Sequence, residues 1–218
     1  MDSLLLAKLA AAAIILLVGF PIHEFSHAFA ADRLGDRTAR YQGRLSLDPR
    51  RHFDPLGGLI LVLTTVGAGL TIGWAKPTPV NPRNLAHGHR GEAIVALAGP
   101  TSNLMLAAAA AISIRVIDAS PAMADAIASS DLLVMTYFVL IYFVKINVLL
   151  FVFNLLPIPP LDGWAVLKGL VSSSTAYQFR QVEQYGIFLL LAVVFFGARL
   201  ILPIFDVIFA LLTGRPRG

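Results

Sequence analysis

Cysteine is absent from this chain of 218 residues, which excludes disulfides and thiolate metal ligands. Any metal site must therefore be built from His, Asp, Glu or backbone oxygen. Charge is also scarce, because only 14% of the residues are charged while 57% are hydrophobic, and the mean hydropathy is +0.75. Average soluble domains carry about 25% charged residues. The composition therefore predicts an integral membrane protein.

Long hydrophobic runs are plentiful. Four segments each offer the roughly 20 apolar residues that a membrane-spanning helix needs: residues 3–20 (running on to about residue 31), 91–114, 132–156 and 186–213. A fifth segment, 56–73, is shorter and richer in Gly and Thr. The first segment begins like a signal peptide, but its apolar run exceeds signal length, so we expect it to be retained.

Basic residues gather beside the membrane segments and not along a soluble face. Residues 31–55 contain six arginines, whereas residues 116–131 contain three aspartates and no Lys or Arg. Membrane topology explains this asymmetry, and with it the net charge of +4, better than nucleic-acid binding does. By the positive-inside rule, the loop after the first spanning segment is expected on the cytoplasmic side.

The first apolar segment contains an H-E-x-x-H motif, HEFSH at 23–27. Residues four apart return to nearly the same face of a helix, so His23 and His27 can present two imidazoles to one Zn²⁺. Glu24 lies close enough to take the proton of a water molecule. Ionisable side chains inside a hydrophobic span are costly unless they face a polar interior. The motif therefore predicts zinc-dependent hydrolysis within the membrane.

Asp162 is the predicted third ligand, since catalytic zinc usually has three protein ligands and an open fourth position. It follows a segment with three prolines, NLLPIPPLDG at 154–163, which unwinds the chain after an apolar helix. Unwound backbone at membrane depth must line a cavity or be buried in protein. Zinc lowers the pKa of its bound water to about 7 and polarises the scissile carbonyl. Glu24 would pass the proton of that water to the leaving amine.

The topology must bring these groups to one side of the membrane. If segment 56–73 crossed fully, Asp162 would emerge opposite the histidines, so we expect a re-entrant or partly inserted segment. Residues 38–48 alternate at strand spacing, and the prolines of 73–82 confine any strand there to a sheet edge. The predicted fold is an all-α polytopic membrane protein with four spanning helices and short edge β-strands on the cytoplasmic side. It forms a single domain over 1–218.

Three motifs, HEFSH at 23–27, AGPTSN at 98–103 and NLLPIPPLDG at 154–163, occur in an order that resembles the site-2 protease family of intramembrane zinc metalloproteases. The resemblance is in particular to the short bacterial forms without a PDZ or CBS domain. The resemblance implies that His23, His27 and Asp162 bind one zinc ion and that Glu24 is the base. It also implies that Asn154 holds the unwound substrate backbone and that Asn103 lines the active site.

The resemblance also gives expectations about substrate, surroundings and location. The resemblance implies a transmembrane protein or peptide as substrate, a lipid bilayer as surroundings and no nucleic-acid partner. It implies a multi-pass protein of the bacterial inner membrane, with its active site towards the cytoplasm. The substrates of the family include anti-sigma factors, membrane-bound transcription factors and remnant signal peptides, and the sequence does not choose among them.

Other interpretations stay open at this point. A metal-transporting or metal-binding membrane protein would use the same His and Asp ligands but would not need Glu24. A relative without activity would be expected to have lost that glutamate. Asn103 and Asn154 are also consistent with hydrogen bonds that hold helices together.

Some histidines, one proline and some charged residues outside the motifs also give expectations. Three histidines in polar connections are expected to be exposed loop residues: His52, His87 and His89. Pro203 is expected to kink or break the last span. Three charged residues within the predicted spans are expected to pair or to face a cavity: Lys145, Arg199 and Asp206.

Overall fold

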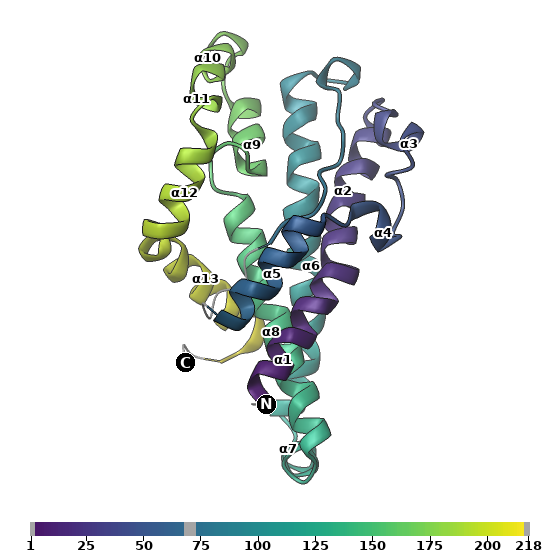
Figure 1. The fold of residues 1–218 in the computed structure, drawn as a ribbon, viewed down its shortest axis with the longest axis vertical. Coiled ribbons are helices and arrows are strands. Elements are labelled where there is room, and N and C mark those ends of the chain that lie inside the picture. The colour runs from purple at the N-terminus through teal and green to yellow at the C-terminus, as the bar shows by residue number, and fades with distance from the viewer. Residues whose placement is uncertain (1–2, 68–72, 216–218) are drawn as a thin grey trace.

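The computed structural model describes residues 3–67 and 73–215, and every regular element within these ranges is a helix (Figure 1). In chain order the elements are α1 (Ser3–Ile14), the π-helical η1 (Ile15–Gly19), α2 (Phe20–Arg33), α3 (Thr38–Tyr41), α4 (Pro49–His52), α5 (Pro55–Gly67), the 3-10 turn η2 (Pro82–Asn84), α6 (His89–Asp118), α7 (Pro121–Ala128), α8 (Asp131–Asn154), α9 (Asp162–Leu170), α10 (Ser173–Gln178), α11 (Arg180–Glu183), α12 (Gly186–Phe196) and α13 (Ala198–Thr213). The prediction of a helical protein with several apolar helices is confirmed for this part of the chain.

Within the described residues, three helices are long and apolar enough to cross a bilayer: the continuous run Leu4–Arg33, α6 and α8. They correspond to the first three predicted spans. The fourth, predicted at 186–213, is instead divided between α12 and α13 at Gly197, a residue type with low helix propensity. In the part of the chain that the structure describes, a fourth span is present if Ser174–Glu183 and α12, which are bent by 73° relative to each other, count as one unit. Of the kink or break predicted at Pro203, the break is wrong, because α13 continues through that residue, and the kink stays a prediction.

The first span changes from α-helical to π-helical geometry just before the H-E-x-x-H motif. Residues Ile15–Gly19 form a π-helical turn, and Pro21 follows it in the first turn of α2. Proline has no N–H to donate, so it cannot complete the α-helical hydrogen bond to the carbonyl four residues earlier. A π-helical turn is a common way to absorb such an irregularity, and these turns are frequent beside functional sites.

The chain between α2 and α6 starts and ends at the same end of the molecule (Figure 1). The N–H of Ala86 donates to the carbonyl of Leu34 at 2.8 Å, and Ala31, Leu85 and Val95 form one hydrophobic cluster. Between these points lies α5, whose 13 residues would extend only about 20 Å. A hydrocarbon core is about 30 Å thick, so α5 alone is too short to span it. Residues 68–72 of the predicted segment 56–73 lie outside the described residues.

The predicted edge strands are wrong for the residues that the structure describes. Residues 38–48 begin with the short helix α3, since Asp36 accepts hydrogen bonds from both the N–H and the hydroxyl of Thr38 and so starts a helical turn. Residues 73–81 are extended, but their backbone bonds go to helices and loops. The N–H of Lys76, for example, donates to the carbonyl of His52 at 2.8 Å. Alternating polarity produced the strand prediction for residues 38–48, but residues 3–67 and 73–215 contain no strand with which they could pair.

The core lies where α8 packs between the other two spans. Small residues of α6, Ala107 and Ala111, allow close contact with Val144 and Val148 of α8. On its other side α8 contacts the first span, where Ile146 packs with residues that include Ala11, Ile15 and Phe20. This arrangement brings α2, α6 and α8 together around the predicted site.

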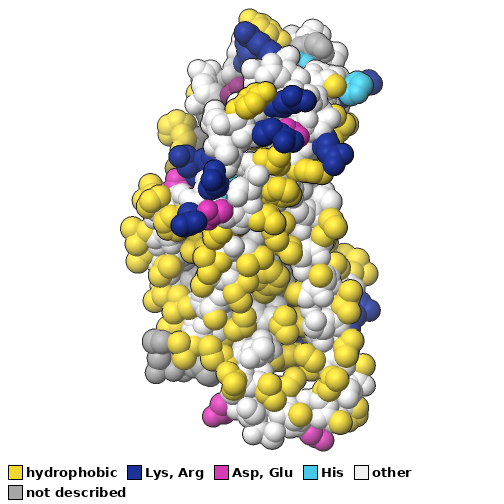
Figure 2. Space-filling view, turned by 90° about the vertical axis from the view of Figure 1, so that its right-hand side faces the viewer, with side chains coloured by type: hydrophobic (Ala, Val, Ile, Leu, Met, Phe, Trp, Pro, Cys, Tyr) yellow, Lys and Arg dark blue, Asp and Glu magenta, His cyan; other side chains and the backbone are white. Residues whose placement is uncertain are grey.

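Charge is distributed unevenly along the molecule. Figure 2 shows most of the visible Lys and Arg side chains in the upper part, towards the end where α2 stops, with a broad hydrophobic surface beneath them and acidic side chains at the lower end. Among the charged residues of the apolar helices, Lys145 has its Nζ 5.5 Å from the centre of the Phe209 ring and 5.8 Å from that of Tyr142. Arg199 is exposed, and Asp206 is half-buried.

A buried carboxylate ties the extended segment 73–81 to the end of α2. Asp36 has no exposed surface, and besides its two bonds to Thr38 it accepts hydrogen bonds from the N–H of Asn81 at 2.6 Å and from the side chain of Asn84 at 3.1 Å. Burial raises the pKa of this carboxyl, but the hydrogen bonds lower it more, so the net shift is downward. The carboxylate form therefore stabilises this junction.

Replacing Asp36 is expected to destabilise the protein. A hydrogen bond to a charged group contributes about 1.5–3 kcal/mol, and Asp36→Ala leaves several buried donors unpaired, so we expect a loss of about 3 kcal/mol. Thermal unfolding in detergent micelles would measure it, with the exposed Asp125→Ala as control. Equal unfolding temperatures for Asp36→Ala and the control would contradict this role.

The same carboxyl predicts a pH dependence. Because its folded pKa lies below the unfolded value of about 3.9, its contribution is present above that pH and is lost as the pH falls through the folded pKa. Asp36→Asn removes this contribution. The stability difference between wild type and Asp36→Asn should therefore shrink below about pH 4, which unfolding curves at several pH values can test. A difference that grows towards low pH would refute the assignment.

Candidate active site

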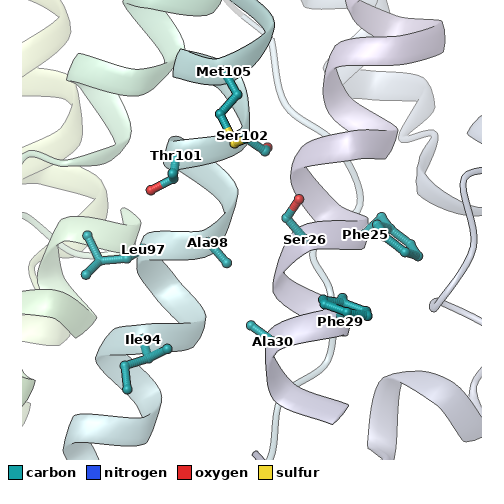
Figure 3. A pocket seen from close by; sticks show the side chains of 10 residues that line it. All are labelled: Phe25, Ser26, Phe29, Ala30, Ile94, Leu97, Ala98, Thr101, Ser102 and Met105. Carbon is teal, nitrogen blue, oxygen red and sulfur yellow. The ribbon is translucent and has the colours of Figure 1, made fainter. Parts of the chain in front are cut away.

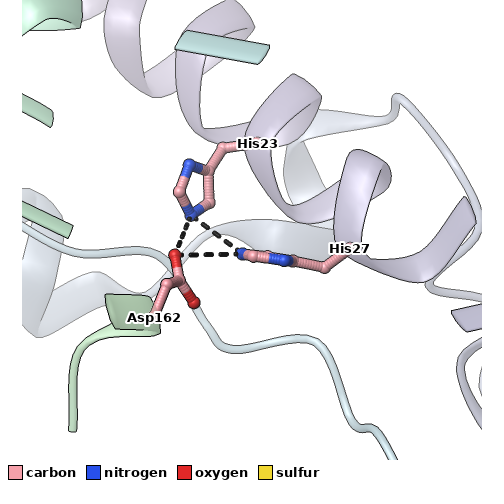
Figure 4. A group of neighbouring side chains, drawn as sticks. All are labelled: His23, His27 and Asp162. Carbon is pink, nitrogen blue, oxygen red and sulfur yellow. Dashed lines mark hydrogen bonds and ion pairs between the residues drawn. The ribbon is translucent and has the colours of Figure 1, made fainter. Parts of the chain in front are cut away.

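The structure brings the three sequence-predicted ligands together (Figure 4). His23 and His27 project from one face of α2, and Asp162 is the first residue of α9. The two Nε2 atoms are 3.1 Å apart, and Oδ2 of Asp162 lies 3.4 Å from that of His23 and 3.3 Å from that of His27. Both imidazoles are more than nine-tenths buried.

Two sides of this triangle have the length that a tetrahedral zinc ion requires, and the third, between the two Nε2 atoms, is slightly shorter. Ligand distances of about 2.0–2.2 Å and tetrahedral angles separate neighbouring ligand atoms by roughly 3.3–3.6 Å. Oδ2 of Asp162 is buried and accepts no hydrogen bond from any residue that the structure describes. An uncompensated buried carboxylate oxygen is costly, and a cation at this point would compensate it. Two imidazoles and a carboxylate are also a usual donor set for catalytic zinc.

Asp162 reaches the histidines because the chain unwinds between α8 and α9. The prolines of residues 155–161 prevent helix continuation, and Gly163 then packs closely on the end of α8. A Cβ at Gly163 would lie 2.3 Å from the carbonyl oxygen of Leu155, so only glycine allows this approach. The ionised carboxylate of Asp162 is the form that binds a metal.

The backbone of α6 supports His27 from behind. Nδ1 of His27 lies 2.8 Å from the carbonyl oxygen of Val95, which can only accept, so Nδ1 carries a proton, and in the neutral imidazole Nε2 keeps its lone pair. Close contact between α6 and the imidazoles depends on Gly99. A Cβ at this position would lie 2.3 Å from Nε2 of His27 and 2.7 Å from Nε2 of His23. The space at the centre of the triangle is thus bounded by bare backbone.

Glu24 is buried and is held by a residue that the sequence analysis did not identify. Its Oε2 accepts a hydrogen bond from the N–H of Thr78 at 2.7 Å, and its backbone carbonyl accepts one from the Thr78 hydroxyl at 2.9 Å. Thr78 belongs to the extended segment 73–81. No local signal marks this partner, because the contact joins residues that are distant in sequence and lie in an irregular segment.

The two predicted substrate-binding asparagines differ in their surroundings. Asn103 has no exposed surface, and its Oδ1 lies 2.6 Å from Nδ1 of His23. Asn154 is half-buried at the end of α8, and its side chain donates to the carbonyl of Leu150 at 3.0 Å. Asn103 thus stands behind a predicted ligand, whereas Asn154 lies at the start of the unwound segment that leads to Asp162.

The three loop histidines lie outside this group of predicted ligands. The expectation that His52 is exposed is wrong, since only 1% of its surface is accessible and its Nε2 lies 2.7 Å from the carbonyl oxygen of Ser46. His87 and His89 are exposed. Nδ1 of His89 lies 3.5 Å from a carboxylate oxygen of Glu92.

A hollow of about 390 Å³ lies beside the site, between α2 and α6 (Figure 3). Its lining is mostly apolar and includes Phe25 and Phe29 on α2 and Ile94 and Met105 on α6. None of the three predicted zinc ligands lines it. The hollow is therefore separate from the proposed metal position, although α2 and α6 border both.

Comparison with known proteins places the chain in a family. The family model of peptidase family M50 matches residues 11–197. "Putative zinc metalloprotease YwhC" of Bacillus subtilis is 37% identical over 195 residues, covering 88% of this chain and 84% of that protein. No solved structure matches the chain.

Mycobacterial relatives are more distant. "Putative zinc metalloprotease Rip2" of Mycobacterium tuberculosis is 33% identical over 178 residues, covering 80% of this chain and 62% of that protein. Its namesake in Mycolicibacterium smegmatis is 30% identical over 173 residues, with 78% and 61% covered. The chain thus spans about three fifths of the Rip2 proteins. On these matches the chain belongs to peptidase family M50, the site-2 protease family, and is a zinc metalloprotease of the site-2 type.

Proposed function

We propose that this protein is an intramembrane protease that hydrolyses peptide bonds within or near the transmembrane segments of membrane proteins. The observation that carries the proposal is that His23 and His27, on a helix of a 30-residue apolar span, meet Oδ2 of Asp162, a buried oxygen that accepts no hydrogen bond from the described residues. In this proposal the three residues hold one catalytic zinc ion. Buried ionisable groups in such a span are retained for function, since their burial is otherwise costly.

Each residue has a role in hydrolysis. Bound zinc supplies Lewis-acid polarisation of the scissile carbonyl and lowers the pKa of water to about 7. Glu24 takes the proton of the attacking water and delivers it to the leaving amine. The N–H of Thr78 holds Oε2 of Glu24, while Oε1 accepts no hydrogen bond from the described residues and is left to move the proton. His23, His27 and Asp162 keep the reacting centre at a fixed position beside Glu24.

The substrate must be unwound before it can be cut, because the amides of a transmembrane helix are already hydrogen-bonded. Segment 73–81 runs extended beside Glu24 through Thr78, and most of it is partly or fully exposed. In place of the edge strands first expected, this segment would offer backbone groups to the unwound chain. Asn154, beside the unwound residues 155–161, would hold the substrate backbone from the other side. Asn103 would act on the site through its contact with Nδ1 of His23.

The arrangement in the membrane follows from charge and chain direction. The arginine-rich loop and the start of α6 lie at the same end as the C-terminus of α2, which favours a cytoplasmic position for that end. Segment 56–73 would then be re-entrant or partly inserted, and the site would face the cytoplasmic side of a bacterial inner membrane. We propose one domain over residues 1–218, surrounded by lipid and acting on transmembrane proteins.

Cleavage of a single-pass model substrate in liposomes tests this function. Wild type loaded with zinc is expected to cut it, and Asp162→Ala is expected to lose cleavage because a ligand is removed. Asp125→Ala on α7, exposed at the far end of the molecule, is the matched control and should cut like wild type. Zinc flux into the liposomes without any cleavage by wild type would overturn the proposal and favour a transporter. Undiminished cleavage by Asp162→Ala would contradict the assigned ligand.

A further inference from the structure

A row of three buried polar side chains connects α8 to the proposed zinc site. Asn147 of α8 has no exposed surface, and neither has Asn103 of α6. The Nδ2 group of Asn147 donates to the carbonyl of Phe143 at 2.9 Å, and its Oδ1 accepts from Nδ2 of Asn103 at 3.0 Å. Oδ1 of Asn103 lies 2.6 Å from Nδ1 of His23. We propose that Asn147 is a positioning residue that sets the tautomer of His23 through Asn103.

The backbone carbonyl of Phe143 decides which group donates and which accepts in every hydrogen bond of this row. The carbonyl of Phe143 can only accept, so Asn147 must turn its NH₂ group towards it. The oxygen of Asn147 then faces Asn103, which must present its own NH₂ group. The oxygen of Asn103 is left for His23 and can only accept. Nδ1 of His23 therefore carries a proton, and in the neutral imidazole its Nε2 keeps a lone pair.

That lone pair is what the site requires, and this role rests on the proposed zinc function. Nε2 of His23 points at Nε2 of His27 and at Oδ2 of Asp162 (Figure 4). A neutral imidazole can carry its proton on either nitrogen, and the partner of one nitrogen decides which. Without Asn147, the amide of Asn103 could turn over and offer an NH₂ group to Nδ1. The proton would then belong on Nε2, where the metal should bind.

The two histidines thus have different kinds of hydrogen-bond partner at Nδ1. His27 is oriented directly by a backbone carbonyl, that of Val95, which cannot rotate. His23 faces a side-chain amide, whose two ends have similar shapes and opposite hydrogen-bonding character. A rotatable partner needs a further contact to hold it, and Asn147 supplies that contact from a third helix. The fixed point at the end of this row is again a backbone carbonyl, that of Phe143.

A role as simple helix–helix glue makes different predictions. Asn–Asn contacts between membrane helices contribute to packing, so their removal would lower the unfolding temperature. It would not alter the zinc affinity of the protein that remains folded. Removal of a residue that supports a ligating histidine typically lowers metal affinity about 10–100-fold. Zinc affinity therefore separates the two roles.

The test measures the zinc affinity of the full chain in detergent micelles by competition with a chelator. Asn147→Leu, which removes both hydrogen bonds, is expected to bind zinc about 10-fold more weakly or worse. Asn147→Ser keeps a bond to its own helix but is too short to reach Asn103, and should show the same loss if the leucine variant does not fold. Thr136→Val on the same helix removes a bond to the carbonyl of Leu132 and should leave the affinity unchanged.

Rescue by a residue of the same shape completes the experiment. Buried in apolar surroundings, the carboxyl of Asn147→Asp is expected to stay neutral, donate its O–H to Phe143 and accept from Asn103, so it should bind zinc like wild type. Folded Asn147→Leu or Asn147→Ser with wild-type zinc affinity would overturn the proposal, and so would an aspartate variant as weak as the leucine variant. If wild type itself binds no zinc, the proposed function fails first, and this role fails with it.

Discussion

Glu24→Gln is expected to abolish peptide-bond cleavage while leaving zinc bound. The amide has nearly the same shape and can still accept the N–H of Thr78 through its oxygen, so the local packing should persist. It cannot take a proton from water, and general base catalysis contributes about 10²–10⁴-fold to a rate. Cleavage of a single-pass substrate in liposomes should fall by at least about 100-fold. Zinc measured on the same preparation should equal that of wild type.

The matched control for this variant is Asp125→Asn, the same kind of charge removal on the exposed helix α7. It should cleave at the wild-type rate. Undiminished cleavage by Glu24→Gln would remove Glu24 from the mechanism. Loss of zinc together with cleavage would show that Glu24 helps to hold the metal, which the proposed set of three ligands does not include.

Gly99→Ala is expected to remove zinc binding without removing any ligand. The added Cβ would lie 2.3 Å from Nε2 of His27 and 2.7 Å from Nε2 of His23, both closer than the 3.0 Å below which Cβ contacts essentially never occur. The imidazoles must then move away from the point where their lone pairs meet. We expect zinc affinity to fall by at least about 100-fold, the upper end for residues that support a ligand. Cleavage should fall with it.

Gly67→Ala provides the comparison, since a Cβ there meets nothing within 4 Å. Both variants replace a helical glycine by alanine, and alanine is the better helix former, so neither should unfold its helix. A Gly99→Ala protein that binds zinc as tightly as wild type would show that the metal lies elsewhere or that α6 moves aside freely. Either result would contradict the compact site described above.

The grouping of the proposed zinc ligands could be predicted from the sequence in large part because it follows from short-range geometry. Spacing of four residues places His23 and His27 on one helical face whatever the rest of the fold does. Asp162 could be anticipated because prolines at the end of an apolar helix must unwind it, and unwound backbone in a membrane belongs at a cavity. The first three spans likewise follow from length and hydropathy alone.

Longer-range features could not be predicted. The alternation in residues 38–48 looked like a strand, but whether a strand forms depends on a partner strand, which the sequence does not display. The last apolar region reads as one span by hydropathy, yet the helix is interrupted at Gly197. Partners such as Thr78 for Glu24 lie in an irregular segment, where no periodicity points from one residue to the other. For Asn147 the sequence shows only a weak signal, which is a polar amide within an apolar span.

The zinc content of the purified protein tests the central claim most directly. Wild type is expected to contain one zinc ion per chain, because two imidazoles and one carboxylate oxygen meet at a single point of suitable size. Asp162→Ala, purified in parallel and folded to the same extent, should contain far less. Wild type without zinc, or Asp162→Ala with the full amount, would contradict the account.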